Sequence, residues 1–372
     1  MNRLTIPLGR VFGIPVRLDP SWFLIFILTT WTLAVSYFPA EFEDWPRVQY
    51  WVVGAVTAVL FFASVVLHEL GHSVLALRYR IPVRAITLYI FGGVAQIGAE
   101  PPSATAEFWI ALAGPLVSFA LSAIFRLLQP AFDAAPPLLA LTKYLAYING
   151  SLAIFNLIPG FPLDGGRVFR AILWGVTKSL RRATLIAATL GRTIAFLFIL
   201  GGVWQLFTGN PGNGLWIAFI GWFLDNAAVS QMRQQAVTTL LAGHRVSEAM
   251  SRSCAVGSAD APLQELVDRH ILGQGQRCLV IEREDDVAGL LTVHHIRKVP
   301  KEKWSTITAA QAMTPVDQMK WVQPNVELQE AVAEMDRNGV NQLPVMTEGR
   351  VLGMLSREDV ISYLRTLQEL GV

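Results

Sequence analysis

The chain has 372 residues, of which 53% are hydrophobic and only 16% are charged, and its formal net charge is +2. Soluble proteins carry roughly 25% charged residues, so this composition excludes a wholly soluble protein. The small net charge, without a basic run that carries interleaved aromatic residues, argues against nucleic acid as a partner. Apolar residues dominate from Pro20 to about Ser230, and charges spread through the rest. We therefore expect a membrane domain over 1–231, a linker over 232–243 and a soluble domain beyond it.

Six segments are apolar and long enough for membrane helices, which need about 20 residues each. The first follows a polar stretch and has no small-residue cleavage site after it, so we expect a retained helix and not a removable signal peptide. The expected spans are about 20–38, 50–77, 107–128, 137–158, 184–207 and 215–229.

The charges between the spans favour one orientation. Basic residues gather after the second and fourth spans. The opposite loops 39–49, 129–136 and 208–214 have Arg47 as their only basic residue. By the positive-inside rule, both termini and the soluble domain are expected in the cytoplasm, as parts of a multi-pass protein of the cell membrane. The basic residues are Arg78, Arg80, Arg84, Arg167, Arg170, Lys178, Arg181 and Arg182.

The segment 81–97 is too short to cross a membrane and is rich in residues that favour strands. We expect a hairpin or another extended segment there. Gly92 and Gly93 allow a turn or a close approach to another backbone. Two interpretations stay open. The segment is an ordinary connector, or it is an edge strand that pairs with an extended substrate.

The second span contains the motif His68-Glu69-Leu70-Gly71-His72. Histidines four residues apart lie on one face of a helix, close enough to share a metal ion. Glu69 stands beside them and is the residue type that takes a proton from zinc-activated water. A structural histidine pair is the alternative, but a central charged side chain in such a helix costs roughly 2.5–3.5 kcal/mol, which favours a functional role.

A catalytic zinc ion takes three protein ligands and keeps one position for water. The other four histidines all lie in the soluble part, so the third ligand in the membrane domain is expected to be a carboxylate. Asp164 is the best candidate, because prolines break the fourth span nearby and Gly165 and Gly166 let the chain come close to the site. Its alternative role is to cap the helix that follows.

Together these motifs resemble the site-2 proteases, zinc enzymes that cut transmembrane segments of regulatory proteins. The resemblance rests on His68-Glu69-Leu70-Gly71-His72 in a membrane helix and on the motif N-x-x-P-x-x-P-x-D-G-G-R over 156–167, and Ala113-Gly114-Pro115 also looks like the family's core. It implies that His68, His72 and Asp164 bind one Zn²⁺ and that Glu69 is the general base. It further implies that Asn156 holds the substrate backbone or the developing oxyanion, with a hydrogen bond between helices as its alternative role.

The soluble part contains an internal repeat, because 246–250 aligns with 309–313 and 289–296 aligns with 353–360. This predicts two α/β repeats, over 244–301 and 302–372. They resemble a tandem pair of CBS domains, which implies a homodimer and an adenine nucleotide such as ATP or AMP in the cleft. The resemblance places that nucleotide near Ser356, Asp359 and Thr292. Two alternatives stay open: Asp359 is a plain helix cap, or the pair packs and dimerises without a ligand. The first copy departs from the pattern, since His295 stands where an Asp is expected.

The predicted fold is thus a membrane all-α bundle of about six helices with a short β hairpin or edge strand, plus a cytoplasmic α/β CBS pair. The predicted function is an intramembrane zinc endopeptidase for regulated intramembrane proteolysis, under nucleotide control. A CBS-gated transporter or channel is one alternative, which predicts polar residues along a pore and no set of metal ligands. A catalytically silent zinc-binding regulator is the other, and the presence of Glu69 argues against it.

Overall fold

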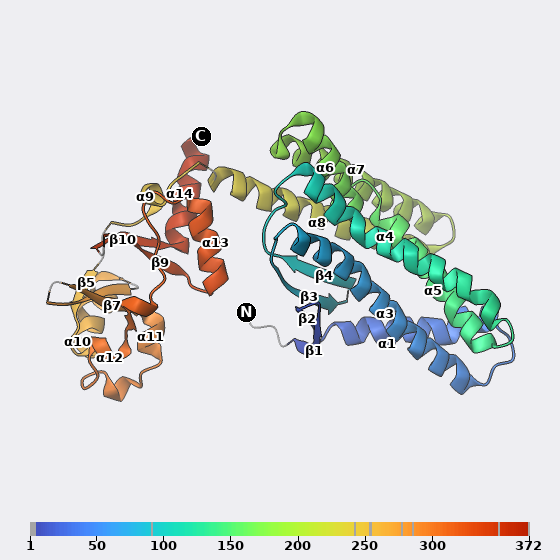
Figure 1. Cartoon of the computed structure of the whole chain (residues 1–372), viewed down its shortest axis with the longest axis horizontal. Helices are drawn as coiled ribbons and strands as arrows, with labels where there is room; N and C mark the ends of the chain where they lie inside the picture. The colour runs from blue at the N-terminus through green and yellow to red at the C-terminus, as the bar shows by residue number, and fades with distance from the viewer. Residues whose placement is uncertain are drawn as a thin grey trace. The chain divides into compact units, whose positions relative to one another are not determined.

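The computed structural model describes residues 5–370, except Phe91, Ala242, Ser253, Cys254, Arg277, Asp285 and Gly349; the side chains of residues 231, 233–239 and 368 are also outside the description. The chain divides into two compact units, Met1–Gln235 and Ala236–Val372 (Figure 1). Each unit is considered by itself below.

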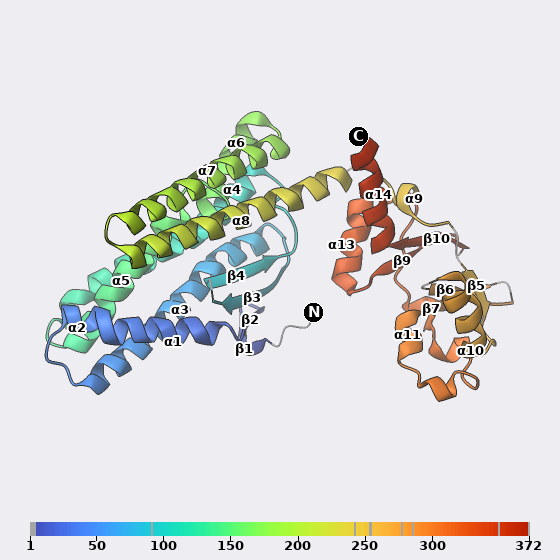
Figure 2. The same ribbon diagram turned by 180° about the vertical axis from the view of Figure 1, so that it is seen from behind.

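The first unit is a bundle of long apolar helices, which lie side by side in both views (Figures 1 and 2). Among the described residues, five helical stretches are long and apolar enough to cross a membrane, which confirms the predicted membrane bundle. The predicted sixth span lies in α8, which contains Asp225 and Asn226 and is not among these five stretches. The helices are α1 (Trp22–Thr32, continued by a π-helical turn Leu33–Tyr37 and by α2, Phe38–Glu41), α3 (Arg47–Arg78), α4 (Ala104–Leu128), α5 (Pro136–Asn156), α6 (Asp164–Thr177), α7 (Leu180–Phe207) and α8 (Pro211–Leu241).

Small residues let the last two long helices of the bundle pack closely. A β-carbon on Gly202 of α7 would lie 2.4 Å from the backbone nitrogen of Ala218 on α8. Glycine at such contacts allows two helix backbones to approach each other within a membrane. α7 also lies against the loop that precedes α6, since a β-carbon on Gly160 would lie 2.6 Å from the α-carbon of Gly191.

A four-stranded sheet lies against α3 and has the order β1-β2-β3-β4. β3 (Val83–Tyr89) and β4 (Gly92–Ile97) form the expected antiparallel hairpin, with β4 at the edge of the sheet. β1 (Ile6–Val11) and β2 (Ile14–Leu18) form a second hairpin that the sequence analysis did not predict, and β2 pairs in parallel with β3.

The second unit has two sheets flanked by short helices, an α/β arrangement as predicted. β5 (Ala255–Ser258), β6 (Cys278–Arg283), β7 (Asp286–Thr292) and β8 (Thr314–Pro315) form one sheet, and β9 (Gln342–Thr347) pairs with β10 (Arg350–Ser356) in the other. The helices are α9 (Val246–Ala249), α10 (Leu263–Leu266, continued by a π-helical segment Val267–Leu272), α11 (Val293–Arg297), α12 (Ala309–Ala312), α13 (Leu328–Asn338) and α14 (Arg357–Leu370), with short 3₁₀ turns at Lys301–Lys303 and Val316–Gln318.

The two repeats of this unit exchange their leading helices. Val246 of α9, which begins the first copy, is buried in the core of the second copy together with Leu328. Ala309 of α12, which begins the second copy, is buried in the core of the first copy together with Leu263. The range predicted as a linker, 232–243, is helical as far as Leu241, which also lies in the core of the second copy.

Candidate metal centre

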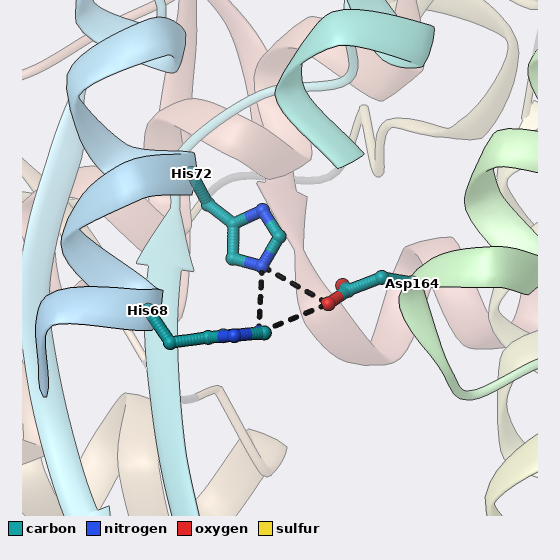
Figure 3. A group of neighbouring side chains, drawn as sticks. All are labelled: His68, His72 and Asp164. Carbon is teal, nitrogen blue, oxygen red and sulfur yellow. Dashed lines mark hydrogen bonds and ion pairs between the residues drawn. The ribbon is translucent and has the colours of Figure 1, made fainter. Parts of the chain in front are cut away.

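His68 and His72 lie one turn apart on α3 and are both 4% exposed. Their Nε2 atoms are 3.3 Å apart. The Oδ2 atom of Asp164, at the start of α6, lies 3.1 Å from each of them (Figure 3). The structure therefore brings together the three predicted ligands, although about 90 residues separate the histidines from Asp164 in the sequence.

The outer nitrogen of each imidazole ring is held by α4. His72 Nδ1 lies 2.7 Å from the backbone oxygen of Ile110, and His68 Nδ1 lies 2.9 Å from Ser118 Oγ. A carbonyl oxygen only accepts hydrogen bonds, so His72 carries its proton on Nδ1 and presents the lone pair of Nε2 to the centre. Such contacts fix the tautomer and orientation of histidines that bind metals.

The donor set fits a zinc ion. Four tetrahedral ligands at about 2.0–2.1 Å from zinc lie roughly 3.3 Å from one another, which is close to the spacings of the three atoms here. A carboxylate oxygen and the bare Nε2 of His72 both attract a cation. With three protein ligands, the fourth position stays open for water or substrate, as in catalytic sites.

A short loop brings Asp164 to the histidines. Helix α5 ends at Asn156 and α6 begins at Asp164. Gly165 and Gly166 fold back on the loop, since their β-carbons would lie 2.3 and 2.4 Å from backbone atoms of Leu157 and Gly160. Leu163 is the cap residue of α6 and Asp164 is its first helical residue, so the carboxylate points to the histidines and does not cap the helix.

The side chain of Glu69 on α3 contacts the edge strand β4. Its Oε2 accepts a hydrogen bond of 3.1 Å from the backbone nitrogen of Ala95. Gly93 passes directly against it, because a β-carbon there would lie 2.6 Å from Glu69 Cγ. Gly92 has a φ of +119°, which only glycine adopts readily. Gly92 is thus required for its backbone conformation, and Gly93 leaves room for the side chain of Glu69.

Asn156 is half-buried at the end of α5, and its amide nitrogen donates to the backbone oxygen of Leu152 on the same helix, at 3.0 Å. The structure shows this local hydrogen bond and does not connect Asn156 to the three ligands. The role of Asn156 in substrate binding stays a prediction.

The second unit contains a cavity of about 640 Å³ between its two repeats. This volume is typical of sites for small molecules. Thr292 lines the cavity, whereas Ser356 and Asp359 are not among its lining residues. The titratable residues that line the cavity are His294, His295, Lys320, Arg357 and Glu358.

Ser356 and Asp359 cap α14. Asp359 Oδ2 accepts hydrogen bonds from the backbone nitrogen and the hydroxyl of Ser356, at 2.8 and 2.6 Å. Thr292 and His295 form the matching cap of α11, with distances of 3.3 and 3.4 Å. Burial, with Lys298 and His294 nearby, lowers the pKa of His295, which therefore favours the neutral form that accepts from Thr292.

Sequence reasoning missed three parts of the metal centre: Ser118, the carbonyl of Ile110, and Gly114. Gly114 is the most direct of them, because a β-carbon there would lie 2.1 Å from His72 Nε2 and 2.6 Å from His68 Nε2. The only signal was Ala113-Gly114-Pro115, noted as part of a family core without a role.

Comparison with known proteins shows what the chain is similar to. Peptidase family M50 matches residues 56–133 and 130–200, and the CBS domain matches residues 309–366. A protein of Synechocystis sp. named zinc metalloprotease sll0528 is 34% identical over 97% of this chain and 96% of its own. The zinc metalloprotease Rip3 of Mycobacterium tuberculosis is 34% identical over 96% of this chain and 92% of its own. The solved site-2 protease from Methanocaldococcus jannaschii is 32% identical, with a TM-score of 0.44, and covers 62% of this chain and 95% of its own.

An apolar helical bundle with a two-histidine, one-carboxylate centre is the arrangement that a membrane metalloprotease requires. The chain belongs to peptidase family M50, the site-2 proteases, and carries a C-terminal CBS domain. It is a zinc metalloprotease, as the resemblance predicted. The family membership does not favour the two alternatives, a CBS-gated transporter or channel and a catalytically silent regulator.

Proposed function

We propose that this zinc metalloprotease cleaves within transmembrane segments of membrane-bound regulatory proteins, as an intramembrane endopeptidase. The observation that carries the proposal is the position of β4. It is the last strand of its sheet, and the backbone nitrogen of Ala95 donates a hydrogen bond to Glu69. A substrate that unwinds and pairs with this edge would lie beside Glu69.

This arrangement meets the needs of the reaction. A bound zinc ion supplies a water molecule of lowered pKa and polarises a carbonyl group. His68, His72 and Asp164 would hold the ion, and Glu69 would accept the proton of the attacking water. A substrate helix satisfies its own amides, so it must be opened before hydrolysis, and strand pairing along β4 would stabilise the opened form.

The decisive experiment compares the zinc-loaded parent with Glu69→Gln on a purified model transmembrane substrate in detergent. We expect the parent to cleave and the variant to be slower by about 10²- to 10⁴-fold, the usual contribution of a general base, while both hold zinc. Equal cleavage by the two proteins, or no cleavage by a zinc-loaded parent, would refute the proposal.

We further propose that both termini and the CBS unit lie in the cytoplasm, as the distribution of Lys and Arg favours. Cysteine substitutions in the loops 39–49 and 208–214 would then react with an impermeant reagent from outside intact cells, and substitutions in the CBS unit would not. The reverse labelling pattern would contradict this orientation.

We also propose that the cavity between the repeats binds an adenine nucleotide, such as ATP or AMP, and that the CBS unit forms homodimers. The predicted contacts are Thr292, which lines the cavity, and Ser356 and Asp359, which do not line it but cap α14, whose first residues Arg357 and Glu358 do. Calorimetry with ATP and AMP on the full chain tests binding, and loss of binding is expected in Asp359→Ala. Unchanged binding in that variant would remove Asp359 from the site, and sedimentation would test the dimer.

A further inference from the structure

Glu107 of α4 and Arg170 of α6 form an ion pair in the interior of the membrane unit. Their side chains are 0% and 5% exposed. Arg170 Nε donates to Glu107 Oε1 at 2.6 Å, and Arg170 Nη2 contacts the same oxygen. The pair joins two helices whose contacting residues are 63 positions apart in the sequence.

Stability alone does not explain this pair. Burying two charges has a desolvation cost that can exceed their attraction, and replacing such pairs by apolar residues is often neutral or stabilising. Here the cost is increased, because Glu107 Oε2 and Arg170 Nη1 are both buried and have no hydrogen-bond partner among the described residues. The best-attested use of a buried pair is to fix the register of the elements that it joins.

Both partners are adjacent to parts of the metal centre. Glu107 lies one turn before Ile110, whose carbonyl oxygen holds His72 Nδ1. Arg170 lies on the helix that begins with Asp164. Its guanidinium also lies over the ring of Phe161, 5.3 Å from the ring centre, in the loop that leads to Asp164.

We propose that Glu107 and Arg170 are positioning residues for the metal centre. The pair fixes α6 and its preceding loop against α4, and so sets Asp164 at the correct distance from the oriented ring of His72. This inference rests on the proposed ligand role of His68, His72 and Asp164, but not on the substrate or on cleavage.

The experiment measures metal binding by the full chain in detergent. Zinc affinity is determined by competition with a chelator, and the absorption spectrum of the Co²⁺-substituted protein reports the coordination geometry. We expect Glu107→Gln and Arg170→Gln each to weaken zinc binding about 10- to 100-fold, as is typical when groups that orient metal ligands are changed. The Co²⁺ bands should lose intensity or shift, and Arg170→Lys, which keeps the charge, should recover part of the affinity.

The matched control is Asp225→Asn. It removes the ion pair of 2.9 Å between Arg192 and Asp225, which joins α7 to α8 without a metal ligand on either helix. We expect this variant to have the same zinc affinity and the same Co²⁺ spectrum as the parent. Each single change leaves one buried charge without its partner and lowers stability, so thermal unfolding of the zinc-free proteins separates positioning from folding in the double variant Glu107→Leu/Arg170→Leu. This variant removes both charges, so its midpoint should agree with that of the parent within a few degrees while its zinc affinity is still lowered.

Two results would overturn the inference. One is parent-like zinc affinity and an unchanged Co²⁺ spectrum in both Glu107→Gln and Arg170→Gln. The other is a loss of zinc affinity that Asp225→Asn reproduces, or parent-like zinc affinity in Glu107→Leu/Arg170→Leu. Failure of the protease proposal gives a different result, in which a zinc-loaded parent does not cleave.

Discussion

Gly114 of α4 faces His72 of α3 so closely that a β-carbon on Gly114 would lie 2.1 Å from His72 Nε2. The same β-carbon would lie 2.6 Å from His68 Nε2. Both nitrogens are proposed zinc ligands, so the absence of a side chain at this position leaves the space that the ion and its open coordination position need. Gly114 is therefore part of the metal centre although it offers no ligand atom.

Gly114→Ala should abolish zinc binding at stoichiometric concentration and reduce cleavage at least about 100-fold. The added methyl group would occupy the space between the ligand atoms and force the two histidines apart. Zinc content after gel filtration, measured by atomic emission, tests this directly. Gly175→Ala in α6 is a suitable control, because the nearest contact of its added β-carbon is 3.9 Å away. A Gly114→Ala protein that retains one zinc per chain would contradict our account of the site.

Gly93→Ala should reduce cleavage while leaving zinc binding intact. The new β-carbon would lie 2.6 Å from Glu69 Cγ, so Glu69 or β4 must move. Displacing a catalytic group by about 1 Å can cost about 100-fold in rate, so we expect a fall of between about 10- and 100-fold, mainly in kcat. Steady-state kinetics on the zinc-loaded proteins checks the prediction. Unchanged kcat, or loss of zinc together with activity, would show that Gly93 does not act through Glu69.

Ser118→Ala should weaken zinc binding about 10- to 100-fold, because His68 would lose the hydroxyl that orients its ring. Ser122→Ala is the matched control on the same helix, since the Ser122 hydroxyl donates to the backbone oxygen of Ala146 and does not touch a histidine. Chelator competition compares the two variants with the parent. Equal zinc affinities of the Ser118 and Ser122 variants would argue that the ring of His68 is held by other contacts.

The CBS unit should lose stability as the pH falls below about 6.5, the ordinary pKa of histidine. The pKa of His295 is lowered in the folded unit, so the unfolded chain binds a proton that the folded unit resists, and acid favours unfolding down to the folded pKa. Hydrogen bonds from His244 and Tyr363 lower the pKa of Glu248 to about 2, so its effect lies at much lower pH.

His295→Asp should reduce this acid sensitivity between pH 7.5 and 5.5. Asp359 caps α14 at the matching position of the second repeat, so an aspartate at 295 can keep the cap of α11 without a histidine to titrate. Pulse proteolysis of the full chain in urea, read on the fragment of the CBS unit, measures its stability at each pH. His270→Asn controls for general effects of removing a histidine. An acid response in His295→Asp equal to that of the parent would assign the effect to other groups.

The metal ligands could be predicted from the sequence because each rests on a local rule or on elimination. Helical spacing pairs His68 with His72, and the lack of another histidine in the membrane part leaves a carboxylate such as Asp164. Ser118 and the carbonyl of Ile110 could not be predicted, since a serine in an apolar helix and a backbone oxygen carry no pattern of their own. Their roles exist only once α4 packs on α3.

The N-terminal hairpin shows the same limit for the fold. Ile14, Val16 and Leu18 alternate with other residues and are all buried, which is the period of a strand. The run is short, however, and its parallel partner β3 begins 65 residues after Leu18. Prolines and glycines around it weaken the strand pattern, and only pairing with a distant strand decides the structure.

The exchange of α9 and α12 means that the two repeats of the second unit are separate as sequences but are one folding unit. A fragment that ends at residue 301 would leave Val246 without the core that covers it, and a fragment that begins at 312 would take Ala309 from the other core. Either half cut out by itself would therefore expose part of its own core, and only the pair taken together closes both.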